Sequence, residues 1–254
     1  MTFVTAERPR SFVRVSGPDA EDYLQRMLSN DVAVLAPGDT CEALLLTAKA
    51  RVIAPLVVFR RGEDDFLLLT EPALGDRVRA ELMRMRFAAK AEIEPEEHTS
   101  TLVFDERPEG GIPNADYGRA AWELLDAALE GEQIAADELE RLRIQAGTPR
   151  YGREIDERVL PAEAGLVERA VSMTKGCYPG QEPIARQHHR GKVNRTLRVL
   201  ELTGAVEPET EIFLGEKAVG RLTSVADGLT LGYVRTEVPD DAELRVGGAE
   251  ARLH

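Results

Sequence analysis

A cysteine, a lysine and a glutamine–glutamate pair lie together in the segment Lys175–Glu182, which reads KGCYPGQE. The thiol of Cys177 stands between two glycines, two residues after the lysine. Glycine permits left-handed backbone and a close approach to neighbouring chain. A helical turn that begins at Pro179 and runs toward Arg186 would bring backbone N–H groups near the thiol, and these favour a thiolate, as does the lysine. The segment therefore indicates an activated cysteine, and the alternative is a small apolar side chain buried in a tight turn.

The cysteines and histidines limit the metal sites that the chain can build. Cys41 and Cys177 are its two cysteines and form no C-x-x-C pair, which disfavours a structural zinc site, a four-cysteine cluster and a disulfide framework. A site made of Cys177 with His188 and His189 is a further hypothesis. Adjacent side chains point apart on most backbones, so we predict solvated histidines and no metal. Cys41 lies in a predicted strand and is interpreted as core.

The chain is strongly acidic, with a formal charge of −13. This charge repels a phosphate backbone at long range, so we expect no direct nucleic-acid binding. The local basic stretch 186–198 still suits a small anionic ligand. No apolar run approaches the roughly 18–20 residues that span a bilayer, and the N-terminus has no apolar stretch of the kind found in secretory signals. We therefore predict a cytoplasmic protein that does not enter a membrane.

Short apolar runs and helical stripes alternate in the first hundred residues. Runs rich in Val, Leu and Ile between turn residues are typical of strands. Proline followed by acidic residues marks the start of a helix, and apolar residues at helical spacing mark its buried face. The expected elements are a strand at 11–15, a helix that begins near Pro18, a meander at 41–47, 51–60 and 65–70, a helix at about 73–88 and a strand–loop–strand stretch at 91–104.

The second half of the chain is less regular. The loop 105–118 is rich in Pro, Gly, Asn and Asp, and a helix is expected at 137–145. The segment 148–182 has little periodicity, and a long irregular stretch in a compact domain is usually functional or disordered. From Arg195 onward, short apolar runs separated by Gly, Pro and Asp predict a small barrel or sandwich of roughly 60 residues.

The segment 175–182 resembles the K-G-C-Y-x-G-Q-E signature of the YgfZ family, and Ala185-Arg186 follows it as in that signature. The resemblance covers nearly the whole chain. Residues 142–166 resemble the R-x-x-x-G-x-P…P-x-E-x-G-L stretch that this family shares with aminomethyltransferases. Residues 29–51 resemble the N-terminal T-N-D-V…P-G…L…P-K-G-R block, and residues 220–224 and 231–234 resemble the C-terminal barrel of the superfamily.

This resemblance implies an α+β fold in which two α+β domains and a small C-terminal β-barrel surround a central channel. It also implies that the channel binds tetrahydrofolate or a folate derivative, with the pterin deep and the glutamate tail toward the mouth. A pterin presents amide-like donors and acceptors and needs apolar walls. We expect a discontinuous folate-binding domain at 1–48 and 106–194, a second domain at 49–105 and the barrel at 195–254.

The resemblance also selects side chains that would contact the ligand. The candidates are Glu154, Glu163 and Gln181 for the pterin, Tyr178 as a wall, Lys175, Arg186 and Arg143 for the anionic tail, and Glu182 within the same motif. Arginine and lysine suit this tail because they bind carboxylates through charge-assisted hydrogen bonds. The alternatives are structural: Glu154 and Glu163 as solvated loop residues, and Arg186 paired with Glu182 one helical turn away.

The chain departs from the aminomethyltransferase pattern at two places. Where G-x-I-D-D-x-x-V-Y-R places two aspartates, this chain has Ala54-Pro55, which cannot exchange a proton or stabilise an amine. A glycine-cleavage aminomethyltransferase activity is therefore disfavoured. Ala48 and Ala50 replace the proline and glycine of the P-K-G-R block, so we expect a re-shaped turn and do not count its lysine and arginine as ligand contacts.

The resulting hypothesis is a monomeric, YgfZ-like folate-binding accessory protein that supports iron–sulfur cluster assembly or repair in client enzymes, including tRNA-modifying ones. Cys177 would supply a thiol that acts as a metal ligand, as a redox group or as a nucleophile. The alternative is a folate-dependent one-carbon transferase or demethylase of the aminomethyltransferase superfamily. That enzyme would need a carboxylate near N5 of the ligand, for which Asp31 and Glu163 are the candidates.

Overall fold

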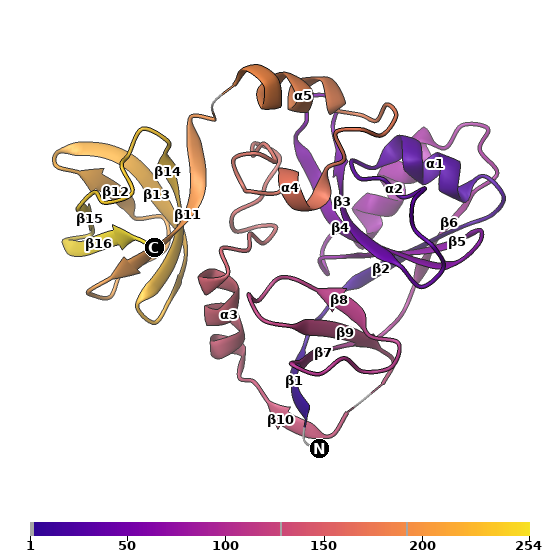
Figure 1. The fold of residues 1–254 in the computed structure, drawn as a ribbon, viewed down its shortest axis with the longest axis horizontal. Coiled ribbons are helices and arrows are strands. Elements are labelled where there is room, and N and C mark those ends of the chain that lie inside the picture. The colour runs from indigo at the N-terminus through magenta and orange to yellow at the C-terminus, as the bar shows by residue number, and fades with distance from the viewer. Residues whose placement is uncertain (1–2, 128, 192) are drawn as a thin grey trace.

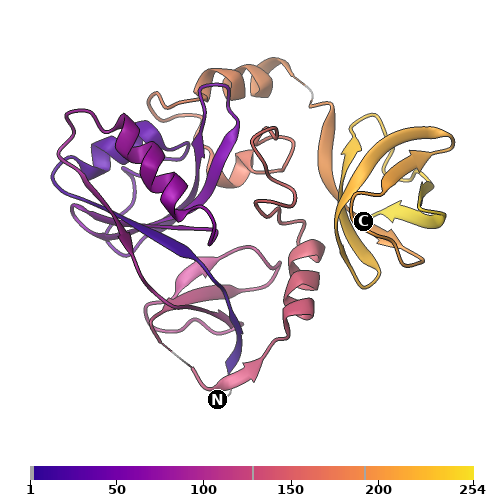
Figure 2. The same cartoon turned by 180° about the vertical axis from the view of Figure 1, so that it is seen from behind.

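The computed structural model describes residues 3–127, 129–191 and 193–254, whose strands form two five-stranded sheets and a closed six-stranded barrel (Figure 1). The two sheets lie next to each other, and the barrel lies at the other end of the molecule. The segment that follows helix α3 (Ala136–Gln145) runs between the sheets and the barrel in both views (Figures 1 and 2). The predicted α+β fold with a C-terminal barrel is confirmed.

The first sheet is antiparallel and carries two helices on one face. Its elements are β2 (Ser11–Ser16), α1 (Ala20–Met27), β3 (Thr40–Leu46), β4 (Val52–Gly62), β5 (Asp65–Thr70), α2 (Gly75–Met85) and β6 (Glu92–Glu96), with strand order β3-β4-β5-β2-β6. Side chains alternate along a strand, so Val13 and Val15 face the helices while Phe12 faces away. Phe12 packs with Leu67 and with Ile112 of the second sheet, which joins the two sheets through apolar contacts.

The second sheet collects short strands from distant parts of the chain. Its strands are β1 (Phe3–Glu7), β7 (Ser100–Phe104), β8 (Ile112–Asn114), β9 (Ala121–Leu125) and β10 (Gly131–Gln133), in the order β10-β1-β7-β9-β8. Strand β10 is parallel to β1 and the other pairs are antiparallel. Leu102 and Phe104 pack against Leu139 and Leu142 of α3, which places that helix against this sheet.

Two short linkers, 8–10 and 97–99, connect the sheets and run beside each other, since Arg8 N donates to Ser100 O at 3.1 Å. His98 in the second linker lies between Glu96 (Nε2 to Oε1, 2.8 Å) and Asp126 (Nδ1 to Oδ2, 2.5 Å). Burial lowers the pKa of His98, but its hydrogen bonds to Asp126 and Glu96 outweigh this effect and raise the pKa above its ordinary value. A protonated His98 therefore bridges the two sheets.

The segment between α3 and the barrel is held by a core of its own. It contains the short helices α4 (Val167–Ala170) and α5 (Gln181–Arg190). Ala164 and Ile184 of this segment pack with Leu44 and Val52 of the first sheet and with Tyr233 of the barrel. The irregular segment thus connects the first sheet to the barrel through buried apolar contacts.

The barrel closes without a free edge. Its strands are β11 (Arg195–Leu202), β12 (Glu211–Leu214), β13 (Lys217–Ala226), β14 (Leu229–Arg235), β15 (Leu244–Val246) and β16 (Ala249–Leu253), in the order β11-β14-β13-β12-β15-β16. Alternate residues such as Leu200, Ile212, Leu222 and Val246 fill its interior. A register shift in β13 between Leu222 and Ser224 turns Ser224 toward the rest of the molecule, where it meets two side chains described below.

The apolar patterns predicted most elements of the first sheet and of the barrel, whereas β1, β8, β9, β10 and β16 were missed. The proposed division into domains stays a prediction. Strands β3 and β4, which pair in one sheet, lie on the two sides of the expected boundary at 48/49. The turn at Ala48-Lys49-Ala50 holds Ala50 in the left-handed conformation (φ 57°) that glycine takes freely, and the Ala50 N–H donates to Thr47 O at 2.9 Å. The re-shaping of this turn relative to the P-K-G-R block stays a prediction.

Candidate functional site

Lys175 lies beneath the end of helix α1 and is buried. Its Nζ donates to the carbonyls of Leu28 (2.8 Å) and Asn30 (2.7 Å), which follow the last turn of that helix. The same Nζ lies 5.5 Å from the centre of the Tyr178 ring. Burial lowers the pKa of Lys175 to about 8, because the charged form loses water. Lys175 thus holds the loop 175–180, called here the cysteine loop, against the end of α1. Its expected contact with an anionic tail stays a prediction.

Cys177 is exposed, so the alternative of a buried apolar side chain is wrong. Cys41 is half-buried and packs against the core of the first sheet, as predicted. Burial raises the pKa of the Cys41 thiol to about 12. Reactivity at neutral pH follows the thiolate fraction and access. Cys177 is therefore the thiol that a partner protein or a reagent can reach.

The two glycines beside Cys177 have different structural roles. Gly180 has a left-handed φ of 87° and directly precedes α5, and a Cβ there would lie 2.7 Å from Thr47 O and 3.0 Å from Ala50 Cα. Glycine is therefore required at 180, because only a residue without a Cβ lets the start of α5 pack this closely against the turn at 47–50. Among the atoms that the structure describes, a Cβ on Gly176 would have no neighbour within 4 Å, and its φ lies outside the left-handed region. Packing does not require glycine at 176.

The remaining residues of the motif face in two directions. Tyr178 is buried in the core of the central segment, and its hydroxyl has no hydrogen-bond partner in the described part of the chain. The Gln181 side chain lies at the hydrogen-bond limit, 3.5 Å from Lys175 O. Glu182 and Arg186 are exposed and pair with each other at 2.6 Å, so the structural alternative for Arg186 is confirmed.

The adjacent histidines project from helix α5. His188 and His189 are both exposed, and their ring centres are 5.4 Å apart. Among residues 3–127, 129–191 and 193–254, no group of three His, Cys, Asp or Glu side chains is arranged to hold a metal ion. Within the described chain, the thiol therefore stands as a single exposed group rather than as part of a metal-binding cluster.

Arg143 and Glu154 form a buried ion pair that joins α3 to the barrel. Their side chains are 2% and 0% exposed, and Arg143 Nη1 lies 3.1 Å from Glu154 Oε2. Ser224 of β13 donates to Glu154 at 2.5 Å and accepts from Arg143 at 2.9 Å. Glu154 is therefore not a solvated loop residue, and the contacts predicted for this pair with folate stay predictions. Glu163 is half-buried and lies 3.2 Å from Arg195 Nε of the first barrel strand.

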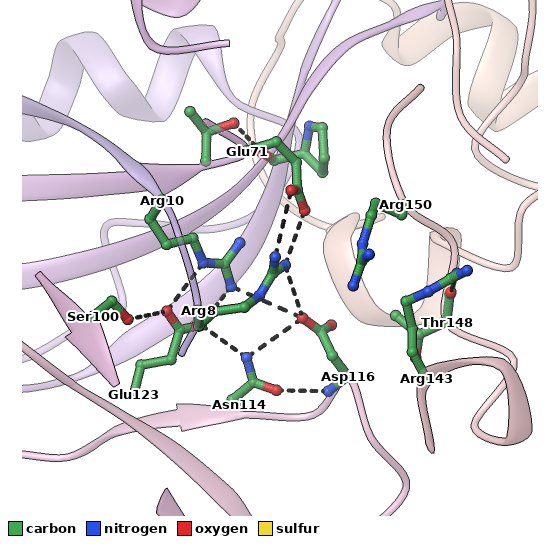
Figure 3. Close-up of polar contacts among 12 residues, drawn as sticks. Arg8, Arg10, Glu71, Ser100, Asn114, Asp116, Glu123, Arg143, Thr148 and Arg150 are labelled. Atoms are coloured by element: carbon green, nitrogen blue, oxygen red, sulfur yellow. Dashed lines mark hydrogen bonds and ion pairs between the residues drawn. The ribbon is translucent and has the colours of Figure 1, made fainter. Parts of the chain in front are cut away.

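A cavity lies where the second sheet, helix α3 and the barrel meet. The resemblance implies a central channel, but none of the residues that line this cavity is among the predicted ligand contacts. Its volume is about 510 Å³, and it shares Arg8, Glu71, Tyr117 and Arg150 with an inner pocket of about 60 Å³. The two pockets adjoin at these four residues and are together called here the central cavity. In Figure 3, Arg8 pairs with Glu71 (2.9 Å), and Arg150 approaches from the loop on the opposite side.

The charged groups around the central cavity are largely compensated. Arg10 pairs with Glu123 on the second sheet, and Asp116 lies 3.6 Å from Arg8 (Figure 3). Asp116 also lies 3.2 Å from Arg169. Burial opposes ionisation of Glu123, but Arg10 lowers its pKa to about 2. These pairs hold the linker at residues 8–10 against the second sheet.

Three buried polar atoms around the central cavity have no partner in the described part of the chain: Tyr117 Oη, Thr148 Oγ1 and Arg8 Nε. Their residues are 2%, 6% and 8% exposed. An unsatisfied buried polar group costs about 1–3 kcal/mol, so such groups indicate a site for a ligand or an ordered water. The signal available in the sequence was a tyrosine in the loop 105–118, rich in turn residues, and an Arg-Pro-Arg linker.

The comparisons with known proteins agree with this architecture. Residues 10–103 match the GCVT N-terminal domain, and residues 194–254 match the CAF17 C-terminal beta-barrel domain. The chain is a GcvT-superfamily protein of the CAF17/YgfZ type. It is 28% identical to the tRNA-modifying protein YgfZ of Edwardsiella ictaluri over 92% of this chain and 85% of that protein. It is 27% identical to the mitochondrial iron–sulfur cluster assembly factor IBA57 of Mus musculus over 77% of this chain and 65% of that protein.

The fold of this GcvT-superfamily chain is also that of a glycine cleavage system aminomethyltransferase T from Bartonella henselae. The TM-score is 0.85 at 18% sequence identity, over 100% of this chain and 85% of that one. Pro55 is one of the two residues that stand where the aminomethyltransferase pattern has aspartates, and it lines the inner pocket. The three carboxylates that line this pocket each pair with an arginine: Glu71 with Arg8, and Glu42 and Asp116 with Arg169. Among the described residues, each carboxylate of the inner pocket is thus engaged by an arginine.

The length and hydropathy of the helices decide whether any of them could span a membrane. In the described chain, none of them is both long enough and apolar enough to cross a bilayer.

Proposed function

We propose that this CAF17/YgfZ-type chain is a cytoplasmic, monomeric accessory protein that binds a reduced folate and supports iron–sulfur cluster assembly or repair in client enzymes, including tRNA-modifying ones. The central cavity, with its three unpartnered buried polar atoms, is the observation that carries the folate part. The names of the YgfZ and IBA57 relatives support the cluster part.

The central cavity suits a folate in size and in chemistry. Its volume of about 510 Å³ falls in the usual range for small-molecule sites. Tyr117 lines both of its parts and offers a ring face together with a free hydroxyl, which suits the pterin. Thr148 and Arg8 add a further hydroxyl and a free N–H. Arg150 and Arg153 on the opposite wall suit the carboxylates of the tail.

The thiol and the cavity are separate parts of the proposed activity. Cys177 is absent from the residues that line either part of the central cavity. We therefore expect Cys177→Ser to bind tetrahydrofolate as the wild type does, and to fail to restore an iron–sulfur tRNA-modifying enzyme in cells that lack the endogenous protein. Full rescue by Cys177→Ser would show that the thiol is dispensable and would remove it from the proposal.

The cavity is tested by a pair of tyrosine substitutions with opposite expected effects. Tyr117→Phe removes a hydroxyl without a protein partner, so stability is unchanged or rises while tetrahydrofolate affinity falls about 10-fold, the value of one hydrogen bond. Tyr233→Phe removes a hydroxyl that donates to Glu154 O at 2.8 Å. It is expected to lose about 1 kcal/mol of stability and to keep its affinity for the monoglutamate. The reverse pattern would contradict the assignment of the cavity.

A further inference from the structure

The most exposed large apolar side chain of the described chain is Phe87, which follows helix α2. This side chain is 83% exposed, and that of Met83, four residues earlier, is 45% exposed. Helix α2 lies at the end of the molecule opposite the barrel (Figures 1 and 2), and neither residue lines the central cavity. Single exposed apolar side chains are ordinary on a protein surface, so exposure alone does not mark a contact site.

The backbone at Phe87 is the second observation. Phe87 follows Arg86, the C-terminal cap of α2, and adopts a left-handed conformation with a φ of 47°. A helix commonly ends with such a residue, which is usually glycine because a Cβ is strained there. Among the non-glycine residues that the structure describes with a positive φ, Phe87 is the one with an aromatic side chain. Neither the end of the helix nor the core therefore accounts for a phenylalanine at this position.

Basic side chains surround the two apolar ones. Residues 82–91 contain Arg84, Arg86 and Lys90 and no acidic residue, in a chain with a formal charge of −13. All three cations are exposed, and the pair of Arg84 with Glu81 (2.6 Å) is of the surface kind that contributes little. Cations at the end of a helix offset its negative pole, which accounts for the charges but not for the apolar side chains beside them. The exposed side chains of residues 83, 84, 86, 87 and 90 are called here the α2 patch.

Helix α1 connects the α2 patch to the cysteine loop. Tyr23 Oη of α1 donates to Leu82 O, next to the patch, at 2.5 Å. Lys175 of the cysteine loop binds the carbonyls of Leu28 and Asn30, just after the same helix. Helix α1 has eight residues and is therefore about 12 Å long. A standard protein interface covers about 800 Å² on each partner and is roughly 30 Å across, so the patch lies within one interface width of the cysteine loop.

We propose that the α2 patch is the surface on which the client protein docks, and that the client presents an acidic surface with an apolar pocket for the Phe87 ring. This inference rests on the proposed function, which requires such a partner. Aromatic residues, Met and Arg are enriched at the centres of protein interfaces, and complementary charge speeds association. An anionic bilayer also attracts basic and apolar side chains, but its extended plane would face the acidic remainder of the chain, whereas a protein contact is confined to the patch.

Phe87→Gly tests the α2 patch without endangering the fold. Glycine suits the left-handed backbone, so the Tm is expected to stay the same or to rise. Tetrahydrofolate affinity is expected to be unchanged, because Phe87 does not line the central cavity. The purified iron–sulfur tRNA-modifying enzyme is expected to bind the variant about 10-fold more weakly than the wild type, the size of effect typical of an interface anchor. Rescue of that enzyme, in cells that lack the endogenous protein, is expected to fall with it.

A charge variant and a matched control accompany this substitution. Arg84→Ala combined with Lys90→Ala is expected to weaken client binding several-fold at low salt, with a smaller effect as salt is added. The Lys90 N–H that donates to Asp19 (2.7 Å) belongs to the backbone and is kept. Leu214→Ala is the control, because Leu214 is an exposed apolar residue at the end of β12 in the barrel. It is expected to bind the client and to rescue as the wild type does.

The outcomes separate this inference from the proposed function. Client binding and rescue by Phe87→Gly at wild-type levels would overturn the α2 patch as a docking surface and leave the proposed function intact. Equal losses in Leu214→Ala would overturn it too. Binding to phosphatidylglycerol vesicles that depends on Phe87, without binding to the client, would assign the patch to a membrane surface and overturn the protein contact. If the wild type neither binds tetrahydrofolate nor rescues, the proposed function fails, and the inference fails with it.

Discussion

Substituting alanine for Gly180 should destabilise the protein strongly, and the cost follows from two features of the structure. The φ of 87° lies in the region that residues with a Cβ adopt at a cost of roughly 1–3 kcal/mol. The new Cβ would also lie 2.7 Å from Thr47 O, a backbone atom that moves only if the turn at 47–50 moves. Overpacking of this kind costs about 1–3 kcal/mol. We expect a total of roughly 2–6 kcal/mol, and a Tm lower by about 4–24 °C.

Gly176→Ala is the matched control, because it adds the same methyl group four residues away in the same loop. Its Cβ meets open space and its φ is not left-handed. Alanine there restricts the unfolded chain, so stability is expected to stay the same or to rise by up to about 1 kcal/mol. Thermal unfolding of both variants by circular dichroism measures the contrast. Equal Tm changes in the two variants would refute the packing of the cysteine loop on the turn at 47–50.

Three further predictions follow from buried or ionised groups. Glu154→Gln leaves Arg143 without its buried partner and should lower the free energy of unfolding by roughly 3 kcal/mol, measured by urea denaturation. Iodoacetamide should label native Cys177 rapidly. It should label Cys41 about 10³-fold more slowly than an ordinary thiol, because the pKa of Cys41 is raised from 9 to about 12. Mass spectrometry of the labelled peptides measures both rates. His98 has a raised pKa, so its stabilising charge is complete below its ordinary value of 6.5 and is lost as the pH rises through the raised value. The stability difference between wild type and His98→Gln should therefore shrink as the pH rises above about 6.5, whereas a constant difference would contradict the charged bridge.

The sequence predicted those parts of the molecule whose cause is local. The apolar runs of β4 and β5 and the helical stripe of α2 are visible as patterns, and the structure contains them. The cysteine motif was equally visible. The contrast between Gly176 and Gly180 was not visible, because it depends on the turn at 47–50 more than a hundred residues earlier. The exposure of Cys177 was not visible either.

Most residues that line the central cavity escaped prediction for a related reason. Arg8, Tyr117 and Arg150 come from a linker, a turn-rich loop and the segment after α3, and only the packing of the two sheets with α3 brings them together. Short strands carry too few residues for a pattern. An example is β10, whose residues 131–133 pair with residues 3–5 of β1, far away in the sequence. Arg143 and Glu154 were singled out by resemblance as ligand contacts, yet tertiary structure pairs them with each other.

The central claim is that the central cavity binds a reduced folate. Calorimetric titration of the wild-type chain with tetrahydrofolate tests it most directly. The account predicts one saturable site per chain, with an affinity that Tyr117→Phe weakens about 10-fold. Absence of saturable binding, under conditions that saturate a known folate-binding protein, would contradict it.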